Sequence, residues 1–163
     1  MIPDIKTILY ASDLGDGSKR AFYMAAKEAF RHNANMIFLN VVEPVSTSTA
    51  TLLEGYLNPQ AIVGMRSQGF ENLKALMESR IDDFCLRELS DRESLANHPV
   101  ARIEEGPAAE TIIQVADELD ADLIVMGTRT RTHSMLGRFF IGSTAQSVMQ
   151  LSNRPVMIVP IEH

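Results

Sequence analysis

Residues 5–42, IKTILYASDLGDGSKRAFYMAAKEAFRHNANMIFLNVV, carry the pattern that decides the fold. Residues 5–11 and 36–42 are short, densely apolar runs, which is typical of strands covered on both faces. Between them, apolar residues recur at helical spacing: Ala21, Phe22, Ala25, Ala26, Ala29 and Phe30. The stretch therefore predicts a strand, a helix and a second strand, the unit from which parallel sheets are built.

The rest of the chain continues this alternation. Helical spacing indicates two further helices, one at Phe70, Leu73, Met77, Ile81 and Phe84 and one at Ala109, Ile112, Ala116 and Leu119. Gly106 breaks the chain before the second of these, and Pro107 suits its first turn. Strands are predicted at residues 99–104, 122–126 and 156–159, and a short helix at residues 143–151. We therefore expect an α/β fold with an open, doubly wound, five-stranded parallel sheet and helices on both faces.

Residues 43–69 are the least regular part of the chain. The segment STSTAT is loop-like, whereas LLEGYL and QAIVGM are each compatible with a helical turn. A long loop in a compact domain is often functional, and a simple connection is the alternative.

Composition limits the possible classes of protein. The chain has 163 residues, 45% of them hydrophobic, which suits a single domain over residues 1–163. The sequence shows neither a signal-peptide pattern nor an apolar run of about 18–20 residues, so we expect a cytoplasmic protein without a membrane partner. The net charge of -6 argues against nucleic acid as a partner. Cys85 is the single cysteine and the four histidines are scattered, so we predict no metal site and interpret Cys85 as an inert helix residue.

One basic segment contrasts with this acidity. GTRTRTHSMLGRFFIGST, residues 127–144, contains three arginines and no acid. Gly127 and Gly142 allow close approach to the backbone, and Gly142 precedes a helix whose first amides favour anions. Ser143 and Thr144 add hydroxyl groups, and the charged residues that can neutralise phosphates are Arg129, Arg131 and Arg138. The segment predicts a phosphate site, and the alternative is a surface loop with solvated arginines.

The ends of the strands complete the predicted site. In open parallel sheets, ligands bind beyond the carboxyl ends of strands, where the winding reverses direction. Asp13 follows the first strand and can accept hydrogen bonds from ribose hydroxyls, while a helix N-cap or a turn is its alternative role. Backbone groups at a strand end can pair with the edge of a base. The sequence has no P-loop, no Gly-x-Gly-x-x-Gly fingerprint after the first strand, and no Ser-His-Asp or Cys-His set.

These residues resemble the universal stress protein family over essentially the full chain. The similar segments are ILYASD, FLNVVEP, ADLIVMGTR and GSTAQSVMQLSNRPVMIVP. ATP-binding members carry Gly-x2-Gly-x9-Gly-Ser/Thr, which places the first glycine at Gly127 and the last pair at Gly142 and Ser143. Thr130 stands at the middle glycine, and the spacing from there to Gly142 is two residues longer than the pattern. The side chain of Thr130 can crowd the phosphates, and Gly137 can restore the lost freedom.

The resemblance implies a Rossmann-like, adenine nucleotide alpha hydrolase-like fold that binds ATP with Mg²⁺. It implies that Asp13 and Val41 hold ribose and adenine. It also implies that the phosphate path is lined by Gly127, Arg129, Thr130, Gly142, Ser143 and Thr144. The predicted nucleotide site comprises Ala11, Asp13, Val41, Met126, Gly127, Arg129, Thr130, Arg138, Gly142, Ser143 and Thr144. The resemblance also implies a homodimer in which the last strands pair across a two-fold axis through Val156, Met157, Ile158 and Val159, and an apolar final strand agrees with this.

Three functions are compatible with this reading. The first is a cytoplasmic stress-response regulatory protein that binds ATP and acts through a homodimer and an unknown protein partner. The second is a slow ATP hydrolase, which is less favoured because no general base or metal-carboxylate pair is evident near Gly142 and Ser143. The third is a dimeric adaptor without nucleotide, in which Thr130 and the longer loop mark a lost site.

Overall fold

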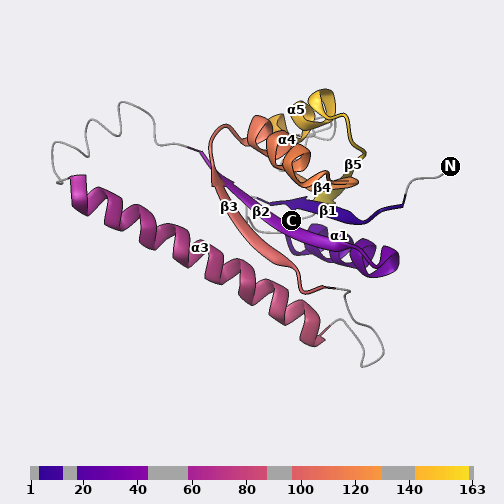
Figure 1. Cartoon of the computed structure of the whole chain (residues 1–163), viewed down its shortest axis with the longest axis horizontal. Helices are drawn as coiled ribbons and strands as arrows, with labels where there is room; N and C mark the ends of the chain where they lie inside the picture. Colours follow the sequence, from indigo (N-terminus) through magenta and orange to yellow (C-terminus); the bar gives the residue numbers. More distant parts are fainter. Residues whose placement is uncertain (1–3, 13–17, 44–58, 88–96, 130–141, 162–163) are drawn as a thin grey trace.

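Strands and helices alternate along the chain, as the sequence predicts (Figure 1). The computed structural model describes residues 4–12, 18–43, 59–87, 97–129 and 142–161. The elements are β1 (Thr7–Ala11), α1 (Ser18–His32), β2 (Asn35–Val42), α3 (Pro59–Arg87), β3 (Val100–Glu105), α4 (Ala108–Leu119), β4 (Leu123–Arg129), α5 (Ser143–Leu151) and β5 (Val156–Ile161).

The five strands form one parallel sheet in the order β3-β2-β1-β4-β5. The chain runs outward from β1 through β2 to β3, and then crosses to the other side of β1 to form β4 and β5. The winding therefore reverses at β1, where Ala11 lies opposite both Leu39 of β2 and Met126 of β4. This is the predicted doubly wound α/β sheet, and the reversal point is the place where such sheets bind ligands.

Helices cover both faces of the sheet, as expected. In Figure 1, α1 and α3 lie on one side and α4 and α5 on the other. Successive residues of β1 point to opposite faces: Ile8 and Tyr10 join the core under α1 and α3, and Leu9 and Ala11 join the core under α4 and α5. Burying one such large apolar side chain stabilises the fold by about 1.5–3 kcal/mol. Burial on both faces explains why the strands have continuous apolar sequences.

Several elements extend beyond their predicted bounds. β4 and β5 reach Arg129 and Ile161, where they still pair with each other. The sequence of β4 has already become polar there, with Thr128 and Arg129. α3 includes the QAIVGM segment in one long helix, whereas LLEGYL lies outside the described residues. Pro107 is the N-cap of α4 and not a residue of its first turn, because its ψ of 131° is extended.

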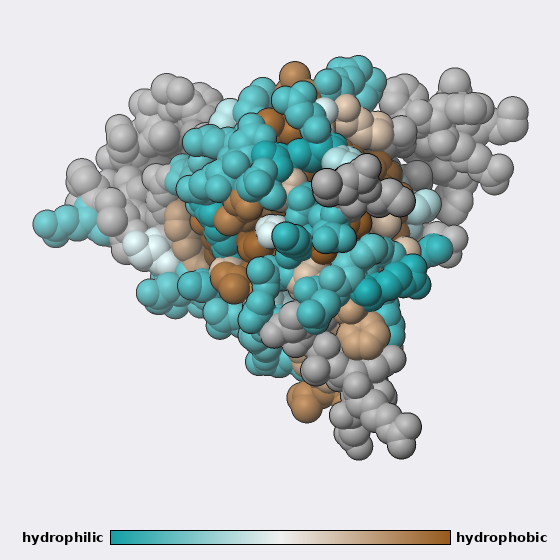
Figure 2. Space-filling view, turned by 45° about the vertical axis from the view of Figure 1, so that its right-hand side comes forward, coloured by the Kyte–Doolittle hydropathy of each residue, from teal (hydrophilic) through white to brown (hydrophobic). Residues whose placement is uncertain are grey.

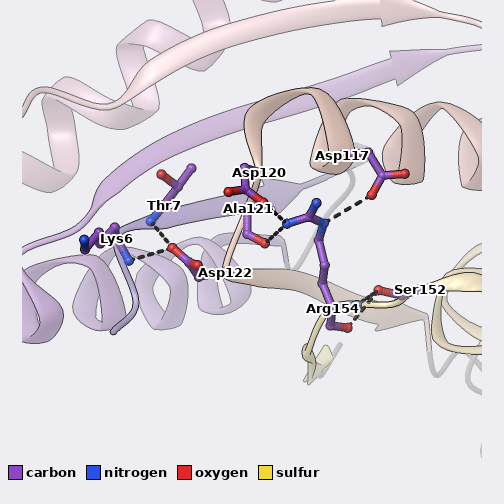
Figure 3. Close-up of polar contacts among 8 residues, drawn as sticks. All are labelled: Lys6, Thr7, Asp117, Asp120, Ala121, Asp122, Ser152 and Arg154. Carbon is purple, nitrogen blue, oxygen red and sulfur yellow. Dashed lines mark hydrogen bonds and ion pairs between the residues drawn. The ribbon is translucent and has the colours of Figure 1, made fainter. Parts of the chain in front are cut away.

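Polar contacts join the amino ends of the strands (Figure 3). One carboxylate oxygen of Asp122 accepts hydrogen bonds from the amides of Lys6 and Thr7, at 2.8 and 3.0 Å, and so connects β1 to β4. The guanidinium of Arg154 contacts Asp117 at 3.2 Å and Asp120 at 3.0 Å, and donates to the carbonyl of Ala121 at 2.6 Å. The start of β5 is thereby fixed against the end of α4.

The outer surface is mainly polar on the face drawn in Figure 2, where hydrophilic side chains surround smaller hydrophobic areas. Among the described residues, no helix has the length and apolar content needed to cross a membrane.

Candidate functional site

A cavity of about 390 Å³ lies at the carboxyl ends of β1, β2 and β4, where the winding reverses. The strand ends, α1, and the first turns of α4 and α5 all contribute to its wall. The described lining residues are Tyr10, Ala11, Ser12, Ser18, Leu39, Val41, Glu43, Ala108, Ile112, Met126, Gly127, Gly142, Ser143, Thr144 and Ala145. The position and the size of the cavity are those of a small-molecule site.

Much of the site proposed from the sequence comes together in this cavity. It is lined by Ala11, Val41, Met126, Gly127, Gly142, Ser143 and Thr144, which lie on four elements or next to them. Arg129 is the last residue of β4. Asp13, Thr130 and Arg138 lie outside the described residues, as do Arg131 and Gly137.

Gly142 and the start of α5 offer backbone donors to the cavity. Gly142 has a φ of 89°, in the left-handed region that only glycine adopts without strain, and a Cβ built on it would meet no atom within 4 Å. The first bond of the helix runs from the amide of Gln146 to the carbonyl of Gly142, and Gly142 makes no side-chain cap. The amides of Ser143 and Thr144 therefore have no acceptor within the helix, and they carry the positive end of its dipole.

The end of β2 offers a second set of backbone groups. The carbonyl of Leu39 accepts from the amide of Ser12 at 3.0 Å, whereas the carbonyl of Val42 accepts from Gly106 on the other side. Because the polar groups of successive strand residues alternate in direction, those of Val41 point to the β1 side, as those of Leu39 do. β1 has ended at Ala11, so the amide and carbonyl of Val41 point beyond it, toward the cavity.

An asparagine explains why β1 stops where it does. Asn40 is buried, and its side-chain amide donates to the carbonyl of Ser12 at 2.8 Å. That bond satisfies the carbonyl that would otherwise continue the ladder with β2. The last β1 residue paired with β2 is Ala11, opposite Leu39, so β1 itself does not extend alongside Val41.

Sequence reasoning missed several lining residues. Ala108 and Ile112 come from the start of α4, which is brought to the cavity because β3 also ends at this edge of the sheet. The break at Gly106 was a usable signal, since it marks a third strand end followed by a helix. Tyr10 and Ser18 line the wall on the α1 side and carried no comparable signal.

The described lining contains little negative charge. Glu43 is exposed and is the single carboxylate among the described lining residues. Within the described part of the chain, no group of three or more His, Cys, Asp or Glu residues could hold a metal ion. The described lining thus presents backbone amides, carbonyls and hydroxyls.

Cys85 lies on α3 and packs against the core under α1 and α3. Burial, and then the nearby carboxylate of Asp82, raise the pKa of the Cys85 thiol. A raised pKa keeps the thiol protonated, which agrees with its interpretation as an unreactive helix residue.

Comparison with known proteins shows the family of this chain. The model of the universal stress protein family matches residues 4–160. The chain belongs to this family.

Two curated universal stress proteins are similar to it along nearly its whole length. One, from Thermus aquaticus, is encoded in the QAH/OAS sulfhydrylase 3' region; it is 31% identical over 154 residues, which is 94% of this chain and 98% of the relative. Another, from Synechocystis, is 30% identical over 155 residues, which is 95% of this chain and 85% of the relative.

Solved structures share the fold. The hypothetical protein MJ0577 matches with a TM-score of 0.72 and 20% identity over 99% of both chains. A universal stress protein in complex with cAMP matches with a TM-score of 0.64 and 22% identity, over 96% of this chain and 98% of the other. The universal stress protein from Archaeoglobus fulgidus in complex with dAMP matches with a TM-score of 0.53 and 18% identity, over 98% and 99%. At these identities the likeness establishes the fold.

Proposed function

We propose that this universal stress protein binds ATP, together with Mg²⁺, in the cavity at the ends of β1, β2 and β4. The protein is a single nucleotide-binding domain that works in the cytoplasm as a homodimer. Its nucleotide state changes its affinity for a protein partner, so its role is regulatory.

The proposal rests mainly on one observation: backbone groups at the end of β2 and at the start of α5 line the same cavity. The amide and carbonyl of Val41, which extend past the end of β1, offer a donor and an acceptor to the edge of adenine, and the amides of Ser143 and Thr144 offer donors to phosphate oxygens. Ala11, Met126 and Ile112 supply apolar surface between these two sets of backbone groups. Relatives of the same fold that hold cAMP and dAMP support an adenine nucleotide as the ligand.

The chemistry of the lining fits a nucleotide that brings its own metal ion. Mg²⁺ prefers oxygen ligands, and in nucleotide sites it is held mainly by phosphates and water. The hydroxyls of Ser143 and Thr144 stand at the start of α5 and could add to those ligands. Glu43, as the single described carboxylate of the lining, gives no pair for metal-assisted hydrolysis, which favours binding over catalysis.

Gly142→Val tests the proposal most directly. A branched side chain there occupies the space in front of the α5 amides and also strains a backbone with a φ of 89°. Wild-type protein should gain melting temperature when ATP is added, since a ligand of the folded state stabilises it, and the variant should gain none. The wild-type gain should shrink as salt rises, because Arg129, Arg131 and Arg138 act partly through screened charge.

Gly69→Val is the matched control. Gly69 lies in α3, and a Cβ there would also meet no atom within 4 Å, but its backbone is helical. This variant should keep the ATP-induced gain, and circular dichroism without nucleotide should show all three proteins folded. A folded Gly142→Val protein that binds ATP as tightly as wild type would remove Gly142 from the site. No ATP effect on wild type would favour the adaptor, and release of phosphate from bound ATP would favour the hydrolase.

A further inference from the structure

Ser18 is a polar residue in the wall of the cavity that the family motif does not include. It is the first residue of α1, its exposed fraction is 3%, and it lines the cavity next to Tyr10. It lies on the α1 side of the sheet, whereas Gly142 and Ser143 lie on the α5 side. Ser18 therefore faces the same cavity from the opposite wall.

Two hydrogen bonds hold Ser18 in place. The phenol of Tyr10 donates to its backbone carbonyl at 3.0 Å. From α3, the guanidinium of Arg80 donates through Nη1 to its hydroxyl oxygen at 2.7 Å. The second bond joins residues 62 apart in sequence and is partly buried. Arg80 thus links α3 to a residue in the wall of the cavity.

Because Arg80 is the donor in this hydrogen bond, the hydroxyl proton of Ser18 remains available for a second hydrogen bond. A guanidinium has only donors, so the Ser18 oxygen must act as the acceptor, and the hydroxyl keeps its own proton as a donor. Among the described residues, no acceptor for that proton is found. Buried polar groups usually form the hydrogen bonds they can, so a donor held at a cavity wall indicates an acceptor in the cavity.

We propose that the Ser18 hydroxyl donates a hydrogen bond to an acceptor oxygen of the bound nucleotide, and that Arg80 is the positioning residue that orients this hydroxyl. The inference rests on the proposed ATP site and adds a contact from the α1 wall. It also makes α3 sensitive to occupancy of the site, because Arg80 and the nucleotide share one hydroxyl.

A double-mutant cycle tests both parts of the proposal. The proteins are wild type, Ser18→Ala, Arg80→Met and the double variant, and calorimetric titration with ATP gives the affinity of each. Ser18→Ala should bind ATP about tenfold more weakly, as expected for a lost hydrogen bond to a charged ligand. Arg80→Met should cause a similar loss, because the hydroxyl is then free to rotate. The double variant should lose about tenfold and not about a hundredfold, because the two residues act as one unit.

The double-mutant cycle distinguishes two roles of Arg80: orienting the Ser18 hydroxyl, or only supporting the fold. If Arg80 only supports the fold, its replacement weakens binding equally in the wild-type and Ser18→Ala proteins, and that result would overturn its positioning role. Arg87→Met, an exposed arginine replaced on the same helix, should leave ATP affinity unchanged. Melting without nucleotide checks the fold, and Arg80→Lys replaces Arg80→Met if the latter does not fold. If wild type binds ATP and Ser18→Ala binds it equally well, the inference alone fails; if wild type binds no ATP, the proposed function fails with it.

Discussion

Single residues decide the chemistry of the cavity, and most of them act through the backbone. Gly142 turns the chain at the start of α5, whose first amides line the cavity, and Asn40 binds the Ser12 carbonyl where β1 ends, so that Val41 extends past the last residue of β1. Neither role depends on a charged side chain. The proposed nucleotide site also needs an acceptor for the ribose hydroxyls, and the candidate that the sequence offers is the carboxylate of Asp13.

Asp13→Ala should weaken ATP binding by about 1–3 kcal/mol, the usual cost of removing a hydrogen bond to a charged group. Calorimetric titration of wild type and variant measures the difference. Asp4→Ala provides the control, because Asp4 is an exposed aspartate that lies before β1, at the amino end of the sheet. Equal affinity of wild type and Asp13→Ala would reduce Asp13 to a turn or helix-cap residue.

At the scale of elements, the sequence was most informative where burial is strongest. β1, β2 and α1 could be predicted closely, because strands buried on both faces are continuously apolar and the buried face of α1 repeats at helical spacing. The start of α3, before Phe70, could not be joined to the predicted helix, because polar residues and two glycines interrupt its apolar spacing. The ends of β4 and β5 were also missed, and these last residues pair with each other across the two strands.

The same reasoning applies to the candidate site. Glycines carry local signals, and these pointed to Gly127 and Gly142, whereas Val41 came from the resemblance to the family; all three line the cavity. Ser18 becomes notable only when α3 brings Arg80 to it, a contact between residues far apart in the chain. Contacts of this kind depend on how the helices pack on the sheet. The spacing of apolar residues within one segment does not predict them.

The contacts of Arg154 connect β5 to α4 and can be tested by replacement. Arg154→Ala should lower the free energy of unfolding by about 1–2 kcal/mol, because the carbonyl of the buried residue Ala121 loses its donor. The exposed carboxylates of Asp117 and Asp120 should contribute little to this loss, since water screens them. Urea unfolding measures the change.

Arg31→Ala is the control for this prediction. Arg31 pairs with Glu28 at 3.5 Å, but its side chain is 72% exposed. Its loss should change the free energy of unfolding by less than about 0.5 kcal/mol. Equal effects of the two replacements would show that the bond to the Ala121 carbonyl adds no stability.

At the scale of the whole molecule, β5 forms one edge of the sheet. The carbonyl of Pro155 points to β4, where it accepts from Ile124, so the polar groups of Val156 and Ile158 point outward. The next outward position is Pro160, which has no amide to offer. The unpaired outward groups of β5 are therefore concentrated in the segment proposed to pair across the two-fold axis.

Ile158→Pro should weaken the proposed homodimer at least about tenfold, because it removes the outward amide without touching the bonds to β4. Ile158→Ala should remain dimeric, since it loses the same packing against the core under α4 and α5 but keeps the amide. Light scattering over a concentration series measures the dissociation of each protein. A monomeric wild type at micromolar concentration would contradict the two-fold pairing.

The central place of β1 also sets an order of events during synthesis on the ribosome. Only α1 separates β1 from its neighbour β2 along the chain. The other neighbour of β1 is β4, which begins at Leu123, opposite Ile8. Until β4 emerges, β1 remains an open strand edge, which is a template for pairing with other chains. The nascent protein thus exposes the edge of a strand that is almost fully buried in the folded sheet until the last quarter of the sequence arrives. Chains that stop before β4 are expected to aggregate instead of forming a smaller stable sheet.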